Sequence, residues 1–174
     1  MPSGSPLHAE PSGETGGESY EAPTFVTGGS GFVGGAVIDQ LVASGADVRA
    51  LARSAASVDR VRMKGATAVD GDLTDHGTLV AGMTGCDITF HVAGVNTMCP
   101  SDPGAMYRTN VDGVRGVVAA AAEAGVRRIV LTSSAAAIGE SEGTVADEET
   151  PHTGEFLSHY ARSKYLGEVA FFEE

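Results

Sequence analysis

Short apolar runs alternate with longer amphipathic stretches along most of this chain. The apolar runs cover residues 24–26, 47–52, 66–69, 87–92 and 128–132. Apolar residues recur at helical spacing over 32–44 and 111–124, and Gly125 is a typical helix stop. Strands that alternate with helices predict an α/β fold. We expect a Rossmann-type, doubly wound parallel sheet with helices on both faces, which makes three layers.

The first residues differ in composition from the rest of the chain. Residues 1–22 are rich in Gly, Ser, Pro and Glu and show no apolar period, so burial cannot offset the entropy of ordering them. The chain has 174 residues and is 42% hydrophobic, which is enough for one sizeable core. We therefore predict a disordered tail over 1–22 and one domain over 23–174.

Charge and composition exclude several classes of function. Eleven Lys and Arg against 23 Asp and Glu give a net charge of -12, which disfavours a nucleic-acid surface. No run approaches the roughly 18 apolar residues that span a bilayer, and the N-terminus does not resemble a signal peptide. Cys86 and Cys99 show no metal-binding or CxxC spacing, and His91, His152 and His159 lack ligand spacing. We expect a cytoplasmic protein without a metal site, membrane partner or nucleic-acid partner.

A glycine-rich segment joins the first predicted strand to the first helix. Residues 27–34 read TGGSGFVG, with Gly28, Gly31 and Gly34 at the key positions. Such glycines allow a tight turn, close approach of the backbone to a pyrophosphate, and packing of the helix on the strand. The amides at the helix N-terminus would face the anion. Taken alone, the pattern also fits a plain strand-to-helix turn, because the chain has 24 glycines.

The end of the second predicted strand indicates which dinucleotide would bind. An acidic residue there would bind the adenosine ribose hydroxyls, but Asp47 lies at the wrong end of the strand and Arg53 follows its carboxyl end. A guanidinium suits a 2'-phosphate, which favours NADP, with NAD as the alternative. Arg49 and Arg60 lie nearby, so a solvated surface arginine is a second interpretation of Arg53.

Six short segments carry a resemblance to a known family. They are 27–34 (TGGSGFVG), 71–75 (GDLTD), 90–94 (FHVAG), 110–113 (NVDG), 132–139 (TSSAAAIG) and 160–168 (YARSKYLGE). Each is common alone, but in this order they resemble the extended short-chain dehydrogenase/reductase family. That family includes NAD-dependent epimerases and dehydratases and the dihydroflavonol-reductase-like enzymes. Together with Arg53, which its place after the second strand suggests, the resemblance implies a cofactor-binding set of Gly28, Gly31, Phe32, Val33, Gly34, Asp72, Leu73, Ala93, Gly94, Tyr160 and Lys164.

Three residues are candidates for catalysis. Tyr160 and Lys164 are four residues apart, so a helix places them on one face, where the ammonium would make the phenol a better proton acceptor. Ser134 follows the fifth strand and is predicted to hold the substrate oxygen for Tyr160. The neighbouring Ser133 remains the alternative. Without the other motifs, an ordinary amphipathic helix would explain the Tyr/Lys spacing equally well.

Members of the resembled family continue well beyond the YxxxK helix. We therefore expect a C-terminally truncated member that lacks the last strands and the region covering the substrate. An uncovered sheet edge predicts marginal stability, a homo-oligomer or a missing continuation. The favoured activity is NAD(P)-dependent oxidoreduction of a small carbonyl or alcohol. The alternatives are a nucleotide-sugar epimerase or dehydratase with bound NAD, and a catalytically silent nucleotide-binding module.

Overall fold

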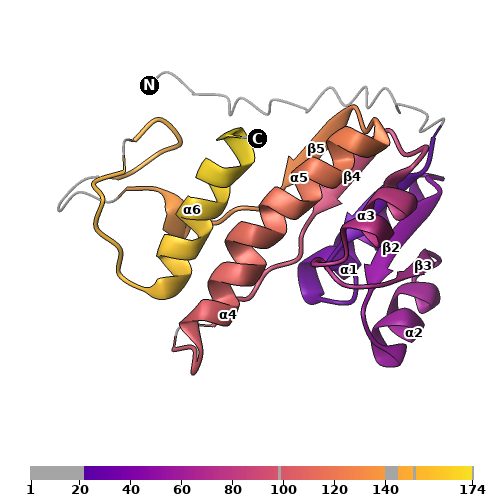
Figure 1. Cartoon of the computed structure of the whole chain (residues 1–174), viewed down its shortest axis with the longest axis horizontal. Coiled ribbons are helices and arrows are strands. Elements are labelled where there is room, and N and C mark those ends of the chain that lie inside the picture. Colours follow the sequence, from indigo (N-terminus) through magenta and orange to yellow (C-terminus); the bar gives the residue numbers. More distant parts are fainter. Residues whose placement is uncertain (1–21, 98, 140–144, 151, 174) are drawn as a thin grey trace, which may run out of the picture.

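Five parallel strands form one sheet at the centre of the molecule (Figure 1). The computed structural model describes residues 22–97, 99–139, 145–150 and 152–173, so nearly all of the predicted 1–22 tail lies outside it. The strand order is β3-β2-β1-β4-β5. The strands are β1 (Thr24–Thr27), β2 (Val48–Ala52), β3 (Thr67–Asp70), β4 (Ile88–His91) and β5 (Arg128–Leu131). The Rossmann-type prediction is confirmed, with strand ends within one residue of those expected.

Helices cover the two faces of the sheet, as the alternating pattern predicts. On one face lie α1 (Phe32–Ala43) and α2 (Ala55–Met63), and on the other lie α3 (His76–Met83) and α5 (Gly113–Ala124). Helix α6 (His159–Glu173) runs beside α5 (Figure 1). The shorter elements are α4 (Pro103–Tyr107), the π-helical turn η1 (Arg108–Asp112) and the 3₁₀ turn η2 (Ala135–Ala137).

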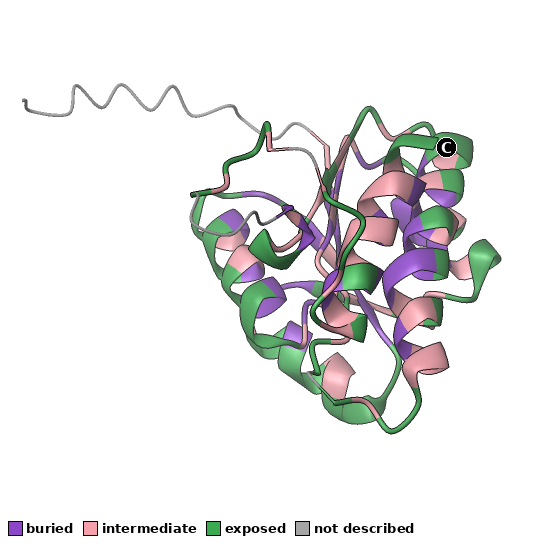
Figure 2. Ribbon diagram, turned by 90° about the vertical axis from the view of Figure 1, so that its left-hand side faces the viewer, coloured by how far each residue is buried: buried purple, intermediate pink, exposed green. Residues whose placement is uncertain are grey.

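Two apolar clusters hold the layers together, one on each side of the sheet. Val26 and Ala50 pack against Ile38 of α1 on one side. Phe25 packs with Leu79 of α3 on the other side. Burying each large side chain contributes about 1.5–3 kcal/mol, so these contacts fix the helices on the strands. Figure 2 shows the buried residues concentrated on the strands and on the inward helix faces.

Local signals set most of the helix ends. Ser54 accepts a hydrogen bond from the Ser57 amide at the start of α2, and Gly125 ends α5 with a φ of 76°. The stop predicted at Gly125 is therefore confirmed. The predicted helix over 111–124 begins differently, because a π-helical turn precedes α5. A π-helical turn departs from the 3.6-residue period, so periodicity could not locate it.

The order of the strands creates a crevice at their carboxyl ends. From β1 the chain moves to β2 and β3 on one side, then crosses back to β4 and β5 on the other. Ligands bind at such a switch point in open α/β sheets, between the carboxyl ends of the diverging strands. Here that point lies between β1 and β4. Among the described residues, no helix is long and apolar enough to cross a membrane.

Candidate active site

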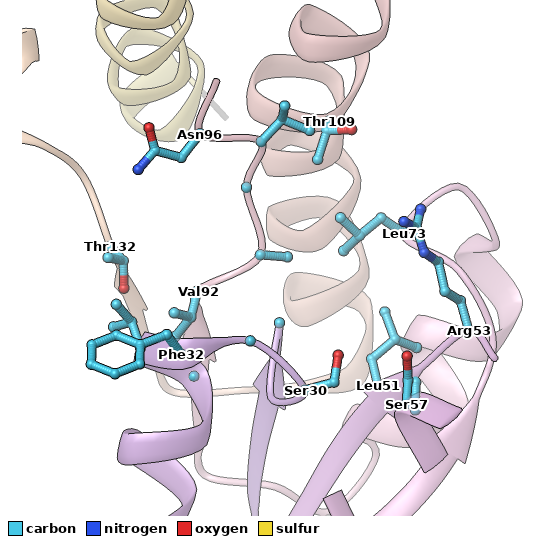
Figure 3. Close-up of a pocket in the computed structure, with 18 of the residues that line it drawn as sticks. Ser30, Phe32, Leu51, Arg53, Ser57, Leu73, Val92, Asn96, Thr109 and Thr132 are labelled. Carbon is cyan, nitrogen blue, oxygen red and sulfur yellow. The ribbon is translucent and has the colours of Figure 1, made fainter. Parts of the chain in front are cut away.

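A cavity of about 440 Å³ lies at the switch point, which is within the size range of small-molecule sites (Figure 3). Its walls come from the turn after β1, the ends of β2 and β3, the loop after β4, and α6. All twelve predicted cofactor-binding residues line it. The other lining residues are Ser30, Leu51, Ala52, Ser57, Gly71, Val92, Val95, Asn96, Thr109 and Thr132.

The floor of the cavity contains glycines at which any side chain would displace the neighbouring backbone. Gly28 has a φ of 73°, and a Cβ there would lie 2.6 Å from the backbone nitrogen of Ala93. A Cβ on Gly34 would overlap the carbonyl oxygen of Gly28. The turn, α1 and the loop after β4 therefore approach one another as closely as their backbones allow. This is the compact cradle that a pyrophosphate requires.

The N-terminus of α1 opens into this cradle without a side-chain cap. Gly31 is the N-cap residue and supplies no side-chain cap, and no side chain of the described residues hydrogen-bonds to the first amides of the helix. Because those amides lack intrahelical partners and carry the positive end of the helix dipole, they suit an anion. Phe32 lines the cavity and is 96% exposed (Figure 3). An apolar ring so exposed is a surface that a flat ligand could cover.

Arg53 stands at the far wall, immediately after β2, as the sequence predicts. Its Nη1 lies 3.9 Å from Oδ2 of Asp72, but 79% of its side chain is exposed. An exposed pair at this distance contributes little, so the guanidinium is open to another anion. Figure 3 shows Arg53 rising beside Leu73. Asp72 is itself held by Thr74, whose amide and hydroxyl both donate to Oδ1, at 3.1 and 3.0 Å.

Tyr160 and Lys164 line the same cavity from α6. The Lys164 ammonium donates to the carbonyl oxygen of Thr132 over 2.7 Å. Partial burial of this ammonium lowers the pKa of Lys164 below its ordinary value. The hydrogen bond places the charge beside the end of β5, next to the Tyr160 side of the cavity. The arrangement therefore combines a phenol, a cation and an anion-binding turn in one space.

The two candidate serines are placed differently from Tyr160 and Lys164. Neither Ser133 nor Ser134 lines the cavity among the described residues. Ser134 caps η2, where its Oγ accepts from the Ala136 amide over 3.2 Å. The buried Ser133 Oγ has no hydrogen-bond partner among the described residues. The catalytic role predicted for Ser134, with Ser133 as its alternative, stays a prediction.

Asn110 is a structural residue of the site to which the sequence analysis gave no role. It is buried in η1, where its side-chain amide exchanges hydrogen bonds with the backbone of Val95 at 2.7 and 3.0 Å. Its Nδ2 also donates to Oγ of Ser163 over 2.9 Å. Asn110 therefore ties the loop after β4 to α6. A Cβ on Gly167 would lie 2.5 Å from the Asn110 carbonyl oxygen, so this glycine permits the approach.

Four lining residues outside the motifs and the predicted strands were not predicted: Ser57, Val95, Asn96 and Thr109. Ser57 lies in the first turn of α2, and Asn96 and Thr109 line the opposite end of the cavity (Figure 3). Ser57 follows the Ser54 cap, a local signal that identifies a helix start but does not indicate a ligand. Asn96 lies in a loop, whose course no periodic pattern reveals. Tertiary structure alone brings these residues together.

The sheet order, the glycine turn and the Tyr/Lys pair define a Rossmann-type protein with a nucleotide-sized cavity. The chain belongs to the NAD dependent epimerase/dehydratase family, whose model matches residues 24–172. The resemblance drawn from the six motifs is therefore confirmed.

Individual relatives agree with this assignment. A Stigmatella aurantiaca protein, 4-hydroxy-2-methyl-3-oxo-4-farnesyl-3,4-dihydroquinoline-1-oxide ketoreductase, is 37% identical over 146 residues, which are 83% of this chain and 43% of the relative. The crystal structure of gox2253 is 38% identical with a TM-score of 0.79, covering 87% and 46% of the two chains. An Agrobacterium tumefaciens short-chain dehydrogenase/reductase superfamily protein with bound NAD is 31% identical, with a TM-score of 0.71, covering 84% and 43%. The chain thus spans less than half the length of these relatives.

Proposed function

We propose that this chain binds a nicotinamide adenine dinucleotide and supplies the acid–base pair for hydride transfer to or from a small carbonyl or alcohol. One observation carries the proposal: Tyr160 and Lys164 line the same cavity as the glycine turn. Membership of the family supports the cofactor class. The ketoreductase name of the Stigmatella relative supports carbonyl chemistry.

The residues of the cavity suggest how such a cofactor would be held. The uncapped amides at the start of α1 would take the pyrophosphate, since Gly28 and Gly34 leave room only for backbone there. Asp72 and Leu73 would flank the adenine beside Arg53. The nicotinamide end would then lie toward Ala93 and Tyr160, which places it near the only catalytic candidates in the cavity walls described here.

The chemistry would divide between the cofactor and the chain. A reduced dinucleotide held in the cavity would supply the hydride that the carbonyl carbon takes up. As the C=O π electrons move onto the oxygen, Tyr160 gives that oxygen its hydroxyl proton, so the product is an alcohol. Lys164 would hold its charge beside the resulting phenolate and stabilise it. In the oxidative direction Tyr160 takes the alcohol proton, and Lys164 stabilises the same phenolate.

We further propose that NADP is preferred over NAD. The Arg53 guanidinium is open at the cavity wall, and no acidic side chain follows β2 to hold an unmodified ribose. Arg60 lies on the neighbouring helix turn, where its Nη1 donates to the Ser30 carbonyl over 3.4 Å. A 2'-phosphate would therefore meet positive charge at this end of the cavity.

Titration with each nucleotide tests the preference. We expect NADPH to bind more tightly than NADH, and Arg53→Gln to weaken NADPH binding by about 10- to 100-fold, the loss of one charge-assisted hydrogen bond. NADH binding should change by less than about twofold, because NADH has no 2'-phosphate. Arg62→Gln is the matched control, since it removes one charge from an exposed position on α2 outside the cavity. Tighter binding of NADH by the native chain would contradict the proposal.

Turnover tests the chemistry separately from binding. The chain is supplied with NADPH and a panel of small ketones and aldehydes, and alcohol formation is followed by mass spectrometry. We expect Tyr160→Phe to abolish alcohol formation while NADPH still binds, because only the proton donor is lost. Conversion of sugar nucleotides with retained NAD would instead favour an epimerase or dehydratase. Tight binding without turnover in either panel would favour a silent nucleotide-binding module.

A further inference from the structure

His91 is a buried histidine at the end of β4 for which the proposed chemistry has no use. Only 1% of its surface is exposed. Its Nδ1 lies 2.7 Å from Oγ1 of Thr27, the last residue of β1. The same Thr27 oxygen accepts a hydrogen bond from the amide of Ala93 over 3.2 Å. His91, Thr27 and Ala93 therefore form one chain of hydrogen bonds across the switch point.

The available donors and acceptors determine the direction of these hydrogen bonds. If the Thr27 hydroxyl donates to Nδ1 of His91, its lone pair is free for the Ala93 amide, and only Nε2 of His91 stays unpaired. If Nδ1 carried the proton instead, both the Thr27 hydroxyl proton and Nε2 would lack partners among the described residues. The first arrangement leaves one buried polar group without a partner and the second leaves two, and each such group is costly, which favours the first arrangement. It requires a neutral imidazole protonated on Nε2.

The surroundings of His91 keep it in that neutral state. Burial of the ring, followed by the charge of Lys164, lowers the pKa of His91 to about 4. At neutral pH the imidazole is therefore uncharged and Nδ1 is available as an acceptor.

We propose that His91 is a positioning residue of the cofactor site, which orients the Thr27 hydroxyl so that it holds Ala93 and Gly94 against the glycine turn. The inference rests on the proposed function, because it assigns His91 to the dinucleotide cavity. Ala93 and Gly94 line that cavity, whereas His91 and Thr27 do not. His91 thus acts through Thr27, without contact to the ligand.

The close packing at this point explains why orientation matters. The Ala93 nitrogen lies so near Gly28 that a Cβ on the glycine would approach it to 2.6 Å. The glycine turn and the loop after β4 form a continuous cavity floor only while their relative position is fixed. The Thr27–Ala93 hydrogen bond fixes it directly, and the His91 acceptor keeps the Thr27 hydroxyl from rotating away.

Nucleotide binding by four variants tests the link. We expect His91→Leu and Thr27→Val each to weaken NADPH binding by about fivefold, the equivalent of one neutral hydrogen bond. The double variant should lose about the same factor, because both changes break one chain. His91→Asn keeps an acceptor near the Nδ1 position and should bind within about twofold of the native chain.

Thr89→Val is the matched control for these variants. Thr89 lies two residues before His91 on β4 and is fully buried, and its Oγ1 has no hydrogen-bond partner among the described residues. The same change of hydroxyl to methyl should therefore leave NADPH binding unchanged. Multiplicative losses in the double variant, equal losses in His91→Asn and His91→Leu, or an equal loss in Thr89→Val would each overturn the inference.

The tautomer of His91 gives a readout that needs neither cofactor nor turnover. Nitrogen NMR of the ligand-free chain should show Nε2 protonated and Nδ1 unprotonated at neutral pH, and Thr27→Val should change the Nδ1 shift. A proton on Nδ1 would overturn the inference even if the His91 variants fail to fold, and would leave the proposed function intact. A folded native chain that binds neither NADPH nor NADH would overturn the proposed function, and the positioning role with it.

Discussion

Acidification below about pH 6.5 should destabilise this protein through His91. The pKa of His91 is lowered from 6.5 to about 4 in the folded chain, so between these values the unfolded state binds more protons. The contribution of His91 to the free energy of unfolding is therefore fully present above about pH 6.5 and is lost as the pH drops toward about 4. Below about pH 4 it no longer changes. At about 1.4 kcal/mol per pH unit, the loss amounts to about 3 kcal/mol.

Urea unfolding at several pH values measures this loss. The free energy of unfolding should fall by about 3 kcal/mol between pH 7 and pH 4, a large part of the stability of a typical domain. The pKa values of Asp75 and Asp102 are lowered below 3.8 by hydrogen bonds from Thr78 and Ala105 respectively, with help from Arg108 for Asp102. Protonation of these carboxylates therefore costs stability only at lower pH, outside the window of His91.

His91→Asn isolates the effect, because the variant keeps a polar side chain and lacks the titrating ring. Its free energy of unfolding should change much less than that of the native chain over the same pH range. Parallel pH profiles for the two proteins would refute the reasoning. So would a native profile that is flat between pH 7 and pH 4, since a ring buried and neutral in the fold cannot give one.

Three further substitutions have defined outcomes. Gly34→Ala should weaken NADPH binding at least tenfold, because the new methyl group overlaps the Gly28 carbonyl, and nucleotide titration checks this. For the same reason it should lower the free energy of unfolding by about 1–3 kcal/mol, which urea unfolding measures. Gly116→Ala should instead raise the unfolding free energy by about 0.5–1 kcal/mol, since its Cβ would meet only the Leu73 carbonyl oxygen, at 3.5 Å. Unchanged or lower stability of this variant in urea unfolding would count against the packing described. Lys164→Met should slow carbonyl reduction by about 100-fold or more in a turnover assay, and unaltered turnover would remove the lysine from the proposed chemistry.

The sequence predicts the fold well because its signals are local. Each strand is a short apolar run, and the glycine stop after α5 has the positive φ that only glycine adopts readily. The irregular segments were harder to predict. Helix α4 has only five residues, too few to show an apolar period, and η1 is a π-helical turn. Both pack against α6.

For the candidate site as well, local motifs predict some residues and tertiary structure places the others. Residues in motifs with fixed spacing, such as Gly28 and Tyr160, line the cavity as expected. Asn96 and Thr109 could not be predicted, because a loop and a π-helical turn bring them to the cavity wall. The spacing of His91 predicted only that it is not a metal ligand. It is buried with one nitrogen paired and the other unpaired, an environment created by neighbouring strands that spacing does not reveal.

Binding of NADPH to the ligand-free chain, combined with amide hydrogen exchange, tests the central claim most directly. We predict saturable binding of one nucleotide per chain, with slower exchange at the turn after β1, over residues 28–34, and in the loop that begins at Ala93. Exchange at the C-terminal end of α5 should not change, because that backbone lies away from the cavity. A folded chain that binds neither NADPH nor NADH, or binds without protection of the glycine turn, would contradict the account.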